Sequence, residues 1–402
     1  MSKNVHMEHI EDMIFNEGVD GARDAINSLR NLRDMLSGKS KSAVNTTVKW
    51  DGAPAIFAGI DPADGKFFVA KKGLFNVNPQ MFKSVSEIKK DAKLNAELKK
   101  KFSIAFTEFS KLGIESGVYQ GDLMFTKGDV ASEEIDEEKY FTFGPNTIVY
   151  AVPVKSKLGS QISRARIGIV WHTTYTGKTI ASMKGSFGKN ISRKFKSISS
   201  VWMQDATYKD ITGNATFNAK ETAKVTALLS EAGKIFKSVP GDLLRVIADN
   251  KELKEKIKTH NNTYVRADVP FPDVDTHVRG LYNYVTDWYD SKIATLKTPK
   301  GQEKWKEEKK VVLKKLFTDS TSLKNVYKLM NKLIEAKSMI IDKMNNASEI
   351  GTFLRTRNGF KATTPEGFVA IDKLTGGAVK LVDRLEFSRA NFSTDVIKGW
   401  EK

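Results

Sequence analysis

Five short groups of lysines, carboxylates and glycines contain the side chains best suited to chemistry. They are KWDG at positions 49–52, VAKKG at 69–73, QGDL at 120–123, EGFV at 366–369 and VKLV at 379–382. A lysine can bind phosphate or, once deprotonated, act as a nucleophile. Carboxylates are the side chains through which proteins bind Mg²⁺, and a glycine beside one lets the backbone approach a ligand closely. Alone, KWDG also fits a solvated lysine beside an Asp-Gly turn, so the set of five carries the argument.

The order of the five groups resembles the covalent nucleotidyltransferase superfamily, which comprises ATP-dependent DNA ligases, RNA ligases and mRNA-capping guanylyltransferases. That family has a KxDG nucleophile, a basic residue followed by glycine, a glycine–acid–leucine strand, an EGxV strand and a final lysine-bearing strand. The resemblance covers about 47–150 and 364–385, and every group falls on a strand-like run. It implies an antiparallel-sheet nucleotidyltransferase (ligase adenylation) domain. A fainter similarity is to uncharacterised proteins of large tailed phages.

The resemblance also implies a role for each matching residue. Lys49 would be the catalytic nucleophile that ATP adenylylates. Asp122, where the family usually has glutamate, and Glu366 would bind Mg²⁺ or Mn²⁺. The implied nucleotide-binding residues are Asp51, Gly52, Lys71, Lys72, Lys380 and Trp171. The last motif departs from the family's KxK arrangement because it has a single lysine, and Arg384 is a candidate to compensate for the second.

Physical chemistry agrees with these roles. Free lysine has a pKa of about 10.4, so a lysine nucleophile needs nearby cations or a divalent metal to lower that pKa. Lys71, Lys72 and Lys380 are the candidate cations, and they would also neutralise the phosphates of a nucleotide. Asp51 lies two residues from Lys49 on the same expected strand, so it would share that face and could hold the ribose or orient the lysine.

Several other residues have both a chemical and a structural interpretation. The family places an aromatic side chain on the purine, and the spacing leaves a choice among Trp171, His172, Tyr175, Phe141 and Phe143, for each of which core packing is the simpler interpretation. His172 fits a hydrogen-bonded structural role better than a catalytic one. The segment DVDTH at 273–277 could suggest a metal site, but a helix cap is favoured. Lysines at 304–315 could contact phosphates or form a solvated helix face.

The elements expected around these residues indicate an α+β fold. Helical spacing runs from Ile10 to Leu36, strand-like runs follow with one helix at 84–112, and helical spacing returns over 222–346 as four to six helices. Strand texture resumes at Gly351. The expected domains are an N-terminal helical segment (1–40), a nucleotidyltransferase domain in two parts (41–215 and 349–402), and an all-α insertion (216–348). Only 22 residues follow Lys380, so we expect no C-terminal OB-fold, which favours an RNA-ligase-like branch.

Composition limits the partners and the chemistry. The 402 residues contain no cysteine, which excludes disulfides, Cys-ligated zinc, iron–sulfur clusters and a thiol nucleophile. A net charge of +17 favours a polyanionic partner, usually nucleic acid. No apolar run of membrane-spanning length and no secretory signal is present, so we expect no membrane and a cytoplasmic location, the host's if the chain is phage-encoded. The sequence leaves the oligomeric state open.

Together these features predict an ATP-dependent polynucleotide ligase, with RNA favoured over DNA as substrate. Lys49 would form a lysyl-AMP intermediate, and a 5′-phosphate would then be joined to a 3′-hydroxyl. The alternatives are a DNA ligase or capping-type enzyme, and a non-catalytic nucleic-acid-binding protein that kept the fold. The incomplete last lysine motif supports the non-catalytic alternative.

Overall fold

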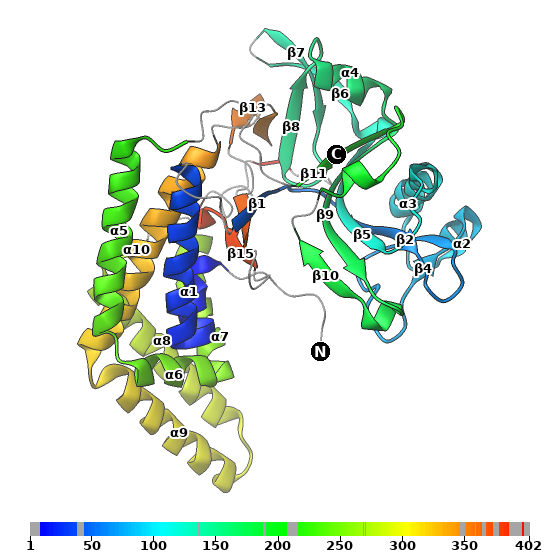
Figure 1. Ribbon diagram of the computed structural model, residues 1–402. Coiled ribbons are helices and arrows are strands. Elements are labelled where there is room, and N and C mark those ends of the chain that lie inside the picture. The colour runs from blue at the N-terminus through cyan, green and yellow to red at the C-terminus, as the bar shows by residue number, and fades with distance from the viewer. Residues whose placement is uncertain are drawn as a thin grey trace.

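The computed structural model shows a helical body beside a β-rich body (Figure 1). The described residues are 9–37, 44–135, 137–187, 190–206, 216–267, 269, 271–345, 350–357, 359–363, 367–372, 378–385 and 396–397. Short 3₁₀ helices lie at Ile10–Asp12, Ser110–Leu112, Lys127–Asp129, Ile180–Ser182 and Ser192–Lys194. The fold is mixed α and β, and all of its strand pairs except β9 with β11 are antiparallel in the part described.

Seven long helices form the helical body. They are α1 (Met13–Leu36), α5 (Ala219–Ser238), α6 (Gly241–Asp249), α7 (Lys251–Arg266), α8 (Val274–Thr295), α9 (Pro299–Phe317) and α10 (Ser320–Asn345). Side-chain caps fix where several begin: Asn218 accepts from the Glu221 amide at α5, and Asp273 accepts from the Thr276 amide at α8. The cap at Asp273 agrees with the structural interpretation of that segment.

The N-terminal helix and the insertion share one hydrophobic core. Leu29 and Leu32 of α1 are buried in the same cluster as Leu229 of α5 and Leu333 of α10. The apolar stripe of α1 needs a partner, and α5, α6 and α10 supply it. The described helices of the two segments expected as separate parts, 1–40 and 216–348, therefore form one packed unit.

A three-stranded sheet connects this unit to the rest of the chain. It has the order β1–β14–β15, with bounds Val44–Lys49, Gly367–Asp372 and Ala378–Leu381. One face belongs to the helical core, because Val48, Phe368 and Leu381 pack there. Alternate residues of the same strands must face the other way.

The largest sheet has seven strands, in the order β10–β9–β5–β2–β3–β4, with β11 also paired to β9. The strands are β2 (Ala55–Ile60), β3 (Phe67–Ala70), β4 (Met81–Phe82), β5 (Val118–Thr126), β9 (Ile167–Thr176), β10 (Lys184–Phe187) and β11 (Val201–Asp205). Helices α2 (Val85–Lys90) and α3 (Ala96–Phe109) lie over one face. The single helix expected at 84–112 is broken because Asp91 accepts from the amides of Lys93 and Leu94, and Asn95 then caps α3.

The third sheet has the order β13–β12–β8–β7–β6. Its strands are β6 (Ala131–Ile135), β7 (Glu138–Phe143), β8 (Ile148–Pro153), β12 (Gly351–Thr356) and β13 (Gly359–Ala362), and α4 (Lys157–Arg164) follows β8. Strand β12 follows the helices in the sequence but pairs with β8, which precedes them. The helical segment is therefore inserted between strands of one β unit. Among the helices of the described ranges, none is long and apolar enough to cross a membrane.

Candidate nucleotide-binding site

Lys49 is the last residue of β1, and it lies beside segments that are more than 300 residues away in the sequence. Its backbone pairs with Gly367 of β14, and Val369 of the same strand pairs with Lys380 of β15. Three of the five motif groups are thus adjacent strands of one small sheet. Gly367 has φ +142°, and a Cβ there would lie 2.4 Å from the Leu381 carbonyl oxygen, so only glycine fits at this close approach.

Strand register puts Lys49 and Lys380 on the same face of this sheet. Directly paired residues of antiparallel strands point to the same side, as do residues two apart on one strand. The opposite face packs against the helical core, so the two lysines face away from it. Strand spacing and rise separate their Cα atoms by roughly 12 Å, a span that two lysine side chains can bridge to a common phosphate group.

Asp51 anchors the turn that follows Lys49. Its carboxylate, 7% exposed, accepts bonds from Asn146 Nδ2 at 2.6 Å and from the backbone amides of Thr147 and Ile148, both at 2.8 Å. Its own amide donates to Tyr150 Oη at 2.7 Å. Strand β1 ends at Lys49, so Asp51 does not share its face as expected. Both carboxylate oxygens accept from protein donors, an arrangement that fits the second expected role, orienting Lys49, better than the ribose contact.

Gly52 brings the same turn down onto β5. A Cβ at this position would lie 2.5 Å from Asp122 Cβ and 3.2 Å from the Leu123 carbonyl oxygen. The next residue extends the contact, because the Ala53 amide donates to the Leu123 oxygen at 3.0 Å. Gly52 therefore acts through shape, by holding the Lys49 turn against the strand that carries Asp122.

Asp122 projects from β5 with a quarter of its side chain exposed, and His172 lies beside it. The His172 Nε2 atom is 3.7 Å from Asp122 Oδ1, while Nδ1 is 2.7 Å from the Thr173 hydroxyl. Sequence reasoning assigned His172 a structural role and did not place it beside Asp122. The available signal was strand alternation: if Trp171 points into the core, His172 must point to the other face.

Lys71 and Lys72 follow β3, two strands from Asp122. Ala70 pairs with Phe57 of β2, and Ala55 of the same strand pairs with Asp122. The chain turns there at Gly73, whose φ is +109°. Lys71 is half-buried and Lys72 is exposed. The strand register puts both near the level of Asp122, at roughly 10 Å across the sheet.

An aromatic cluster lies beside these lysines, on the sheet face opposite α2 and α3. The rings of Phe75 and Tyr175 have centroids 4.6 Å apart, and both contact Phe57. Tyr175 donates to Gln120 Oε1 at 2.8 Å, and burial raises its pKa to about 12. Phe75 is half-buried and keeps part of its ring open to solvent.

Trp171 does not join this face. It is fully buried and packs against Phe109 of α3 and Phe195, with centroid distances of 5.4 and 5.6 Å. Its place on β9 directs it under α3, where a base cannot reach it. The nucleotide-binding role expected for Trp171 is thus replaced by core packing.

Arg384 belongs to a structural ion cluster and does not extend toward the sheet face that carries Lys49 and Lys380. Its Nε atom is 2.9 Å from Glu11 Oε1, which also accepts from Lys337 Nζ at 2.7 Å, and its Nη2 atom contacts Asp12. Burial alone would raise the pKa of Glu11, but Lys337 and Arg384 hold it well below its usual value. The cluster fixes the chain that follows β15, and with it the position of Lys380.

The second expected metal ligand, Glu366, lies outside the described residues, directly before Gly367. Among the residues that are described, no three His, Asp or Glu side chains gather closely enough to hold a metal. Asp122 still fits a magnesium ion, because such ions use one or two carboxylates and take their other ligands from water and phosphate.

A family model covers almost the whole chain. It is described as a family of unknown function, DUF6267, and it matches residues 4–396. The chain belongs to this family. No curated protein and no solved structure matches the chain. The DUF6267 match includes both the helical body and the β-rich body, so the site described above lies within the family's own domain.

Proposed function

We propose that this protein is an ATP-dependent nucleotidyltransferase of the polynucleotide-ligase type, with Lys49 as the nucleophile and RNA as the favoured substrate. The observation that carries the proposal is the pairing of β1, β14 and β15. It puts Lys49 and Lys380 on one face, beside Gly367, although 300 residues separate the first strand from the others. Gly52 then holds the Lys49 turn against Asp122. Core packing alone does not require lysines at these positions.

The proposed reaction has three steps. The unprotonated Lys49 amine attacks the α-phosphorus of ATP, so a nitrogen–phosphorus bond forms, the bond to pyrophosphate breaks, and the amine proton passes to solvent. The 5′-phosphate of a polynucleotide next displaces the lysine and takes the AMP. A 3′-hydroxyl then attacks that 5′-phosphate and loses its proton. The new ester bond completes a phosphodiester, and the bond to AMP breaks, so that AMP is released.

The other residues position and neutralise charge. Lys380 on the same face, and Lys71 and Lys72 at the end of β3, would bind and neutralise the phosphates. Asp122 would hold a divalent metal, which supplies charge neutralisation at the phosphates. Phe75 replaces Trp171 as the aromatic side chain proposed for the base, because it follows Lys72 closely and is only half-buried.

The polymer would use the positive surplus of the chain. Helix α9 carries several exposed lysines, including Lys304, Lys310 and Lys314, and such residues bind phosphates without reading sequence. In this assignment the lysines around Asp122 bind the nucleotide, and the remaining basic surface binds the polynucleotide.

A covalent-labelling experiment tests the proposal. Purified protein is incubated with radiolabelled ATP or GTP and Mg²⁺ or Mn²⁺, and then separated on a denaturing gel. We expect labelling from ATP that is lost in Lys49→Ala and kept in Lys93→Ala, which removes an exposed lysine of the segment after α2. Absence of label from the wild type with either metal would contradict the enzyme assignment, and RNA binding without labelling would instead identify a non-catalytic binding protein.

A further inference from the structure

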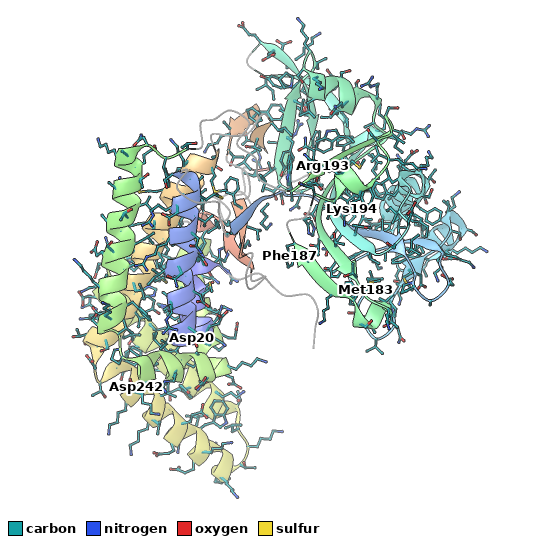
Figure 2. All side chains as sticks on the ribbon, in the orientation of Figure 1. Asp20, Met183, Phe187, Arg193, Lys194 and Asp242 are labelled. Carbon is teal, nitrogen blue, oxygen red and sulfur yellow. The ribbon has the colours of Figure 1, made fainter. Side chains whose placement is uncertain are left out.

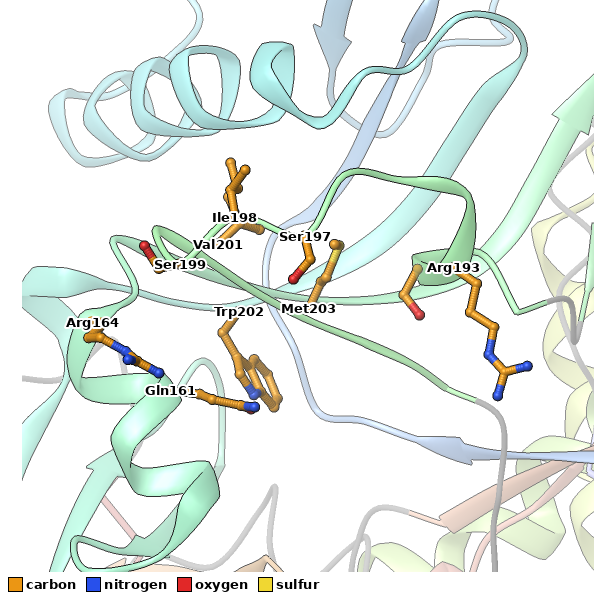
Figure 3. A pocket seen from close by; sticks show the side chains of 10 residues that line it. Gln161, Arg164, Arg193, Ser197, Ile198, Ser199, Val201, Trp202 and Met203 are labelled. Carbon is orange, nitrogen blue, oxygen red and sulfur yellow. The ribbon is translucent and has the colours of Figure 1, made fainter.

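A polar groove lies between α4, the segment 192–199 and β11 (Figure 3). Its volume is about 440 Å³, within the range of pockets that hold small ligands. Its polar lining consists of Gln161, Arg164, Ser192, Arg193, Ser197 and Ser199. No residue of the nucleotide-binding site described above lines this groove.

The lining of the groove carries positive charge, and the acids near it are hydrogen-bonded to protein groups. Asp205 accepts from the amides of Ile191 and Ser192 at 2.6 and 2.9 Å and from the Ser192 hydroxyl. On the α3 side, Glu108 is bound by Lys111 and Ser200 at 2.8 Å. The lining itself contains two arginines and no carboxylate. Neither Arg164 nor Arg193 forms an ion pair within the described part of the chain, and both are exposed.

A buried aromatic side chain also lines this groove. Trp202 is 4% exposed and lines the groove, and its indole Nε1 has no hydrogen-bond partner among the described residues. Figure 3 shows its ring beside Gln161. That nitrogen is enclosed, so the side chains of the lining that can donate to a ligand are Gln161, the two arginines and the serines whose hydroxyls are open. Serine hydroxyls and arginines around it are donors of the kind that bind phosphate.

The groove lies close to Lys49. The rings of Trp202 and Trp50, the residue after Lys49, have centroids 6.4 Å apart in an edge-to-face contact. Strand β11 runs on from Trp202 to Asp205, and the carbonyl of Ala206 accepts from the Val48 amide at 2.6 Å. By strand rise, Met203 and Ala206 are roughly 10 Å apart, a separation of one or two nucleotides.

We propose that this groove binds the phosphate backbone of a single-stranded polynucleotide and directs its end to Lys49. The inference rests on the proposed function, since it gives the ligase substrate a binding site. Two arginines and the hydroxyls of Ser197 and Ser199 act as donors to phosphate oxygens. The hollow has the size of one or two nucleotide units, so it takes a single strand and not a duplex.

The test is fluorescence anisotropy with a fluorescein-labelled single-stranded RNA of about ten nucleotides, a length typical of single-strand sites. The double variant Arg164→Ala/Arg193→Ala removes the two groove arginines. The matched control Arg23→Ala/Arg245→Ala removes two exposed arginines of the helical body. We expect at least a tenfold loss of affinity in the first, with a salt slope reduced by about 1.4 for two phosphate contacts. The control should change affinity less than twofold.

Equal weakening in the two double variants would overturn the proposal, because it would show a general charge effect. Duplex RNA that binds as tightly as the single strand, with the same dependence on the groove arginines, would also overturn it. ATP labelling of the wild type is measured in parallel. Groove-dependent RNA binding without labelling would refute the proposed function alone, whereas labelling with groove-independent binding would refute this inference alone.

Discussion

Removing the Asp51 carboxylate should destabilise the β-rich body and displace Lys49. In Asp51→Ala, the buried amides of Thr147 and Ile148 lose their acceptor, at a cost of about 1–3 kcal/mol each, and Asn146 loses a charged partner. Water can reach part of the emptied site, so we expect a total near the low end, about 4 kcal/mol. With a urea m-value of about 3 kcal/mol per M, the unfolding midpoint should fall by about 1.3 M.

Two comparison variants sharpen this experiment. Asp51→Asn keeps one oxygen for the backbone amides, and Asn146 can turn its own amide oxygen toward the new NH₂ group, so the expected loss is only about 1–2 kcal/mol. Asp20→Ala removes an exposed α1 aspartate that pairs only with Arg23 among the described residues (Figure 2), and should change stability by less than about 0.5 kcal/mol. If the urea unfolding midpoint of Asp51→Ala equals that of the wild type, the anchoring role is refuted and a ribose contact becomes the better interpretation of Asp51.

Two further predictions concern packing and pH. Gly52→Ala should lower the free energy of unfolding by about 1–3 kcal/mol, because the new Cβ would lie 2.5 Å from Asp122 Cβ. The control is Gly128→Ala, whose Cβ would meet only Lys100 Nζ, at 3.8 Å. This control should be nearly neutral in urea unfolding. Burial lowers the pKa of His260 to about 4 and that of His277 to about 3, so the unfolded chain binds more protons between these values and pH 6.5. The free energy of unfolding should therefore fall from pH 6.5 downward by up to about 1.4 kcal/mol per pH unit for each histidine. His260→Phe should reduce that slope in parallel urea titrations at pH 7 and 5, and an unchanged slope would contradict the assignment.

Local patterns predicted the elements well where one physical rule dominated. Helical spacing predicted α1 and an insertion of four to six helices, of which the structure has six in its described part, and alternation or apolar runs predicted the strands at Lys49, Asp122 and Lys380. Strands β4, β6, β10, β11 and β13 and helix α4 were not expected. These are short elements, for which pairing with neighbours outweighs intrinsic preference.

The sequence predicted which residues belong to the candidate site better than it predicted the role of each. Motif order pointed to Lys49 and Lys380, which the structure places in one three-stranded sheet, and to Asp122, which lies on β5 against the turn that follows Lys49. The role of Asp51 was not predictable, because its donors come from the segment 146–148, almost a hundred residues away. Trp171 was misassigned since an aromatic residue on a strand fits either face until the position of α3 is known.

Mapping the covalent adduct tests the central claim most directly. After incubation with ATP and Mg²⁺, the protein is digested at neutral or alkaline pH, which preserves a phosphoramidate, and the peptides are analysed by mass spectrometry. The account predicts AMP on the peptide that contains Lys49, attached to that lysine and absent from Lys49→Ala. An adduct on another lysine, or none on the wild-type protein, would contradict it.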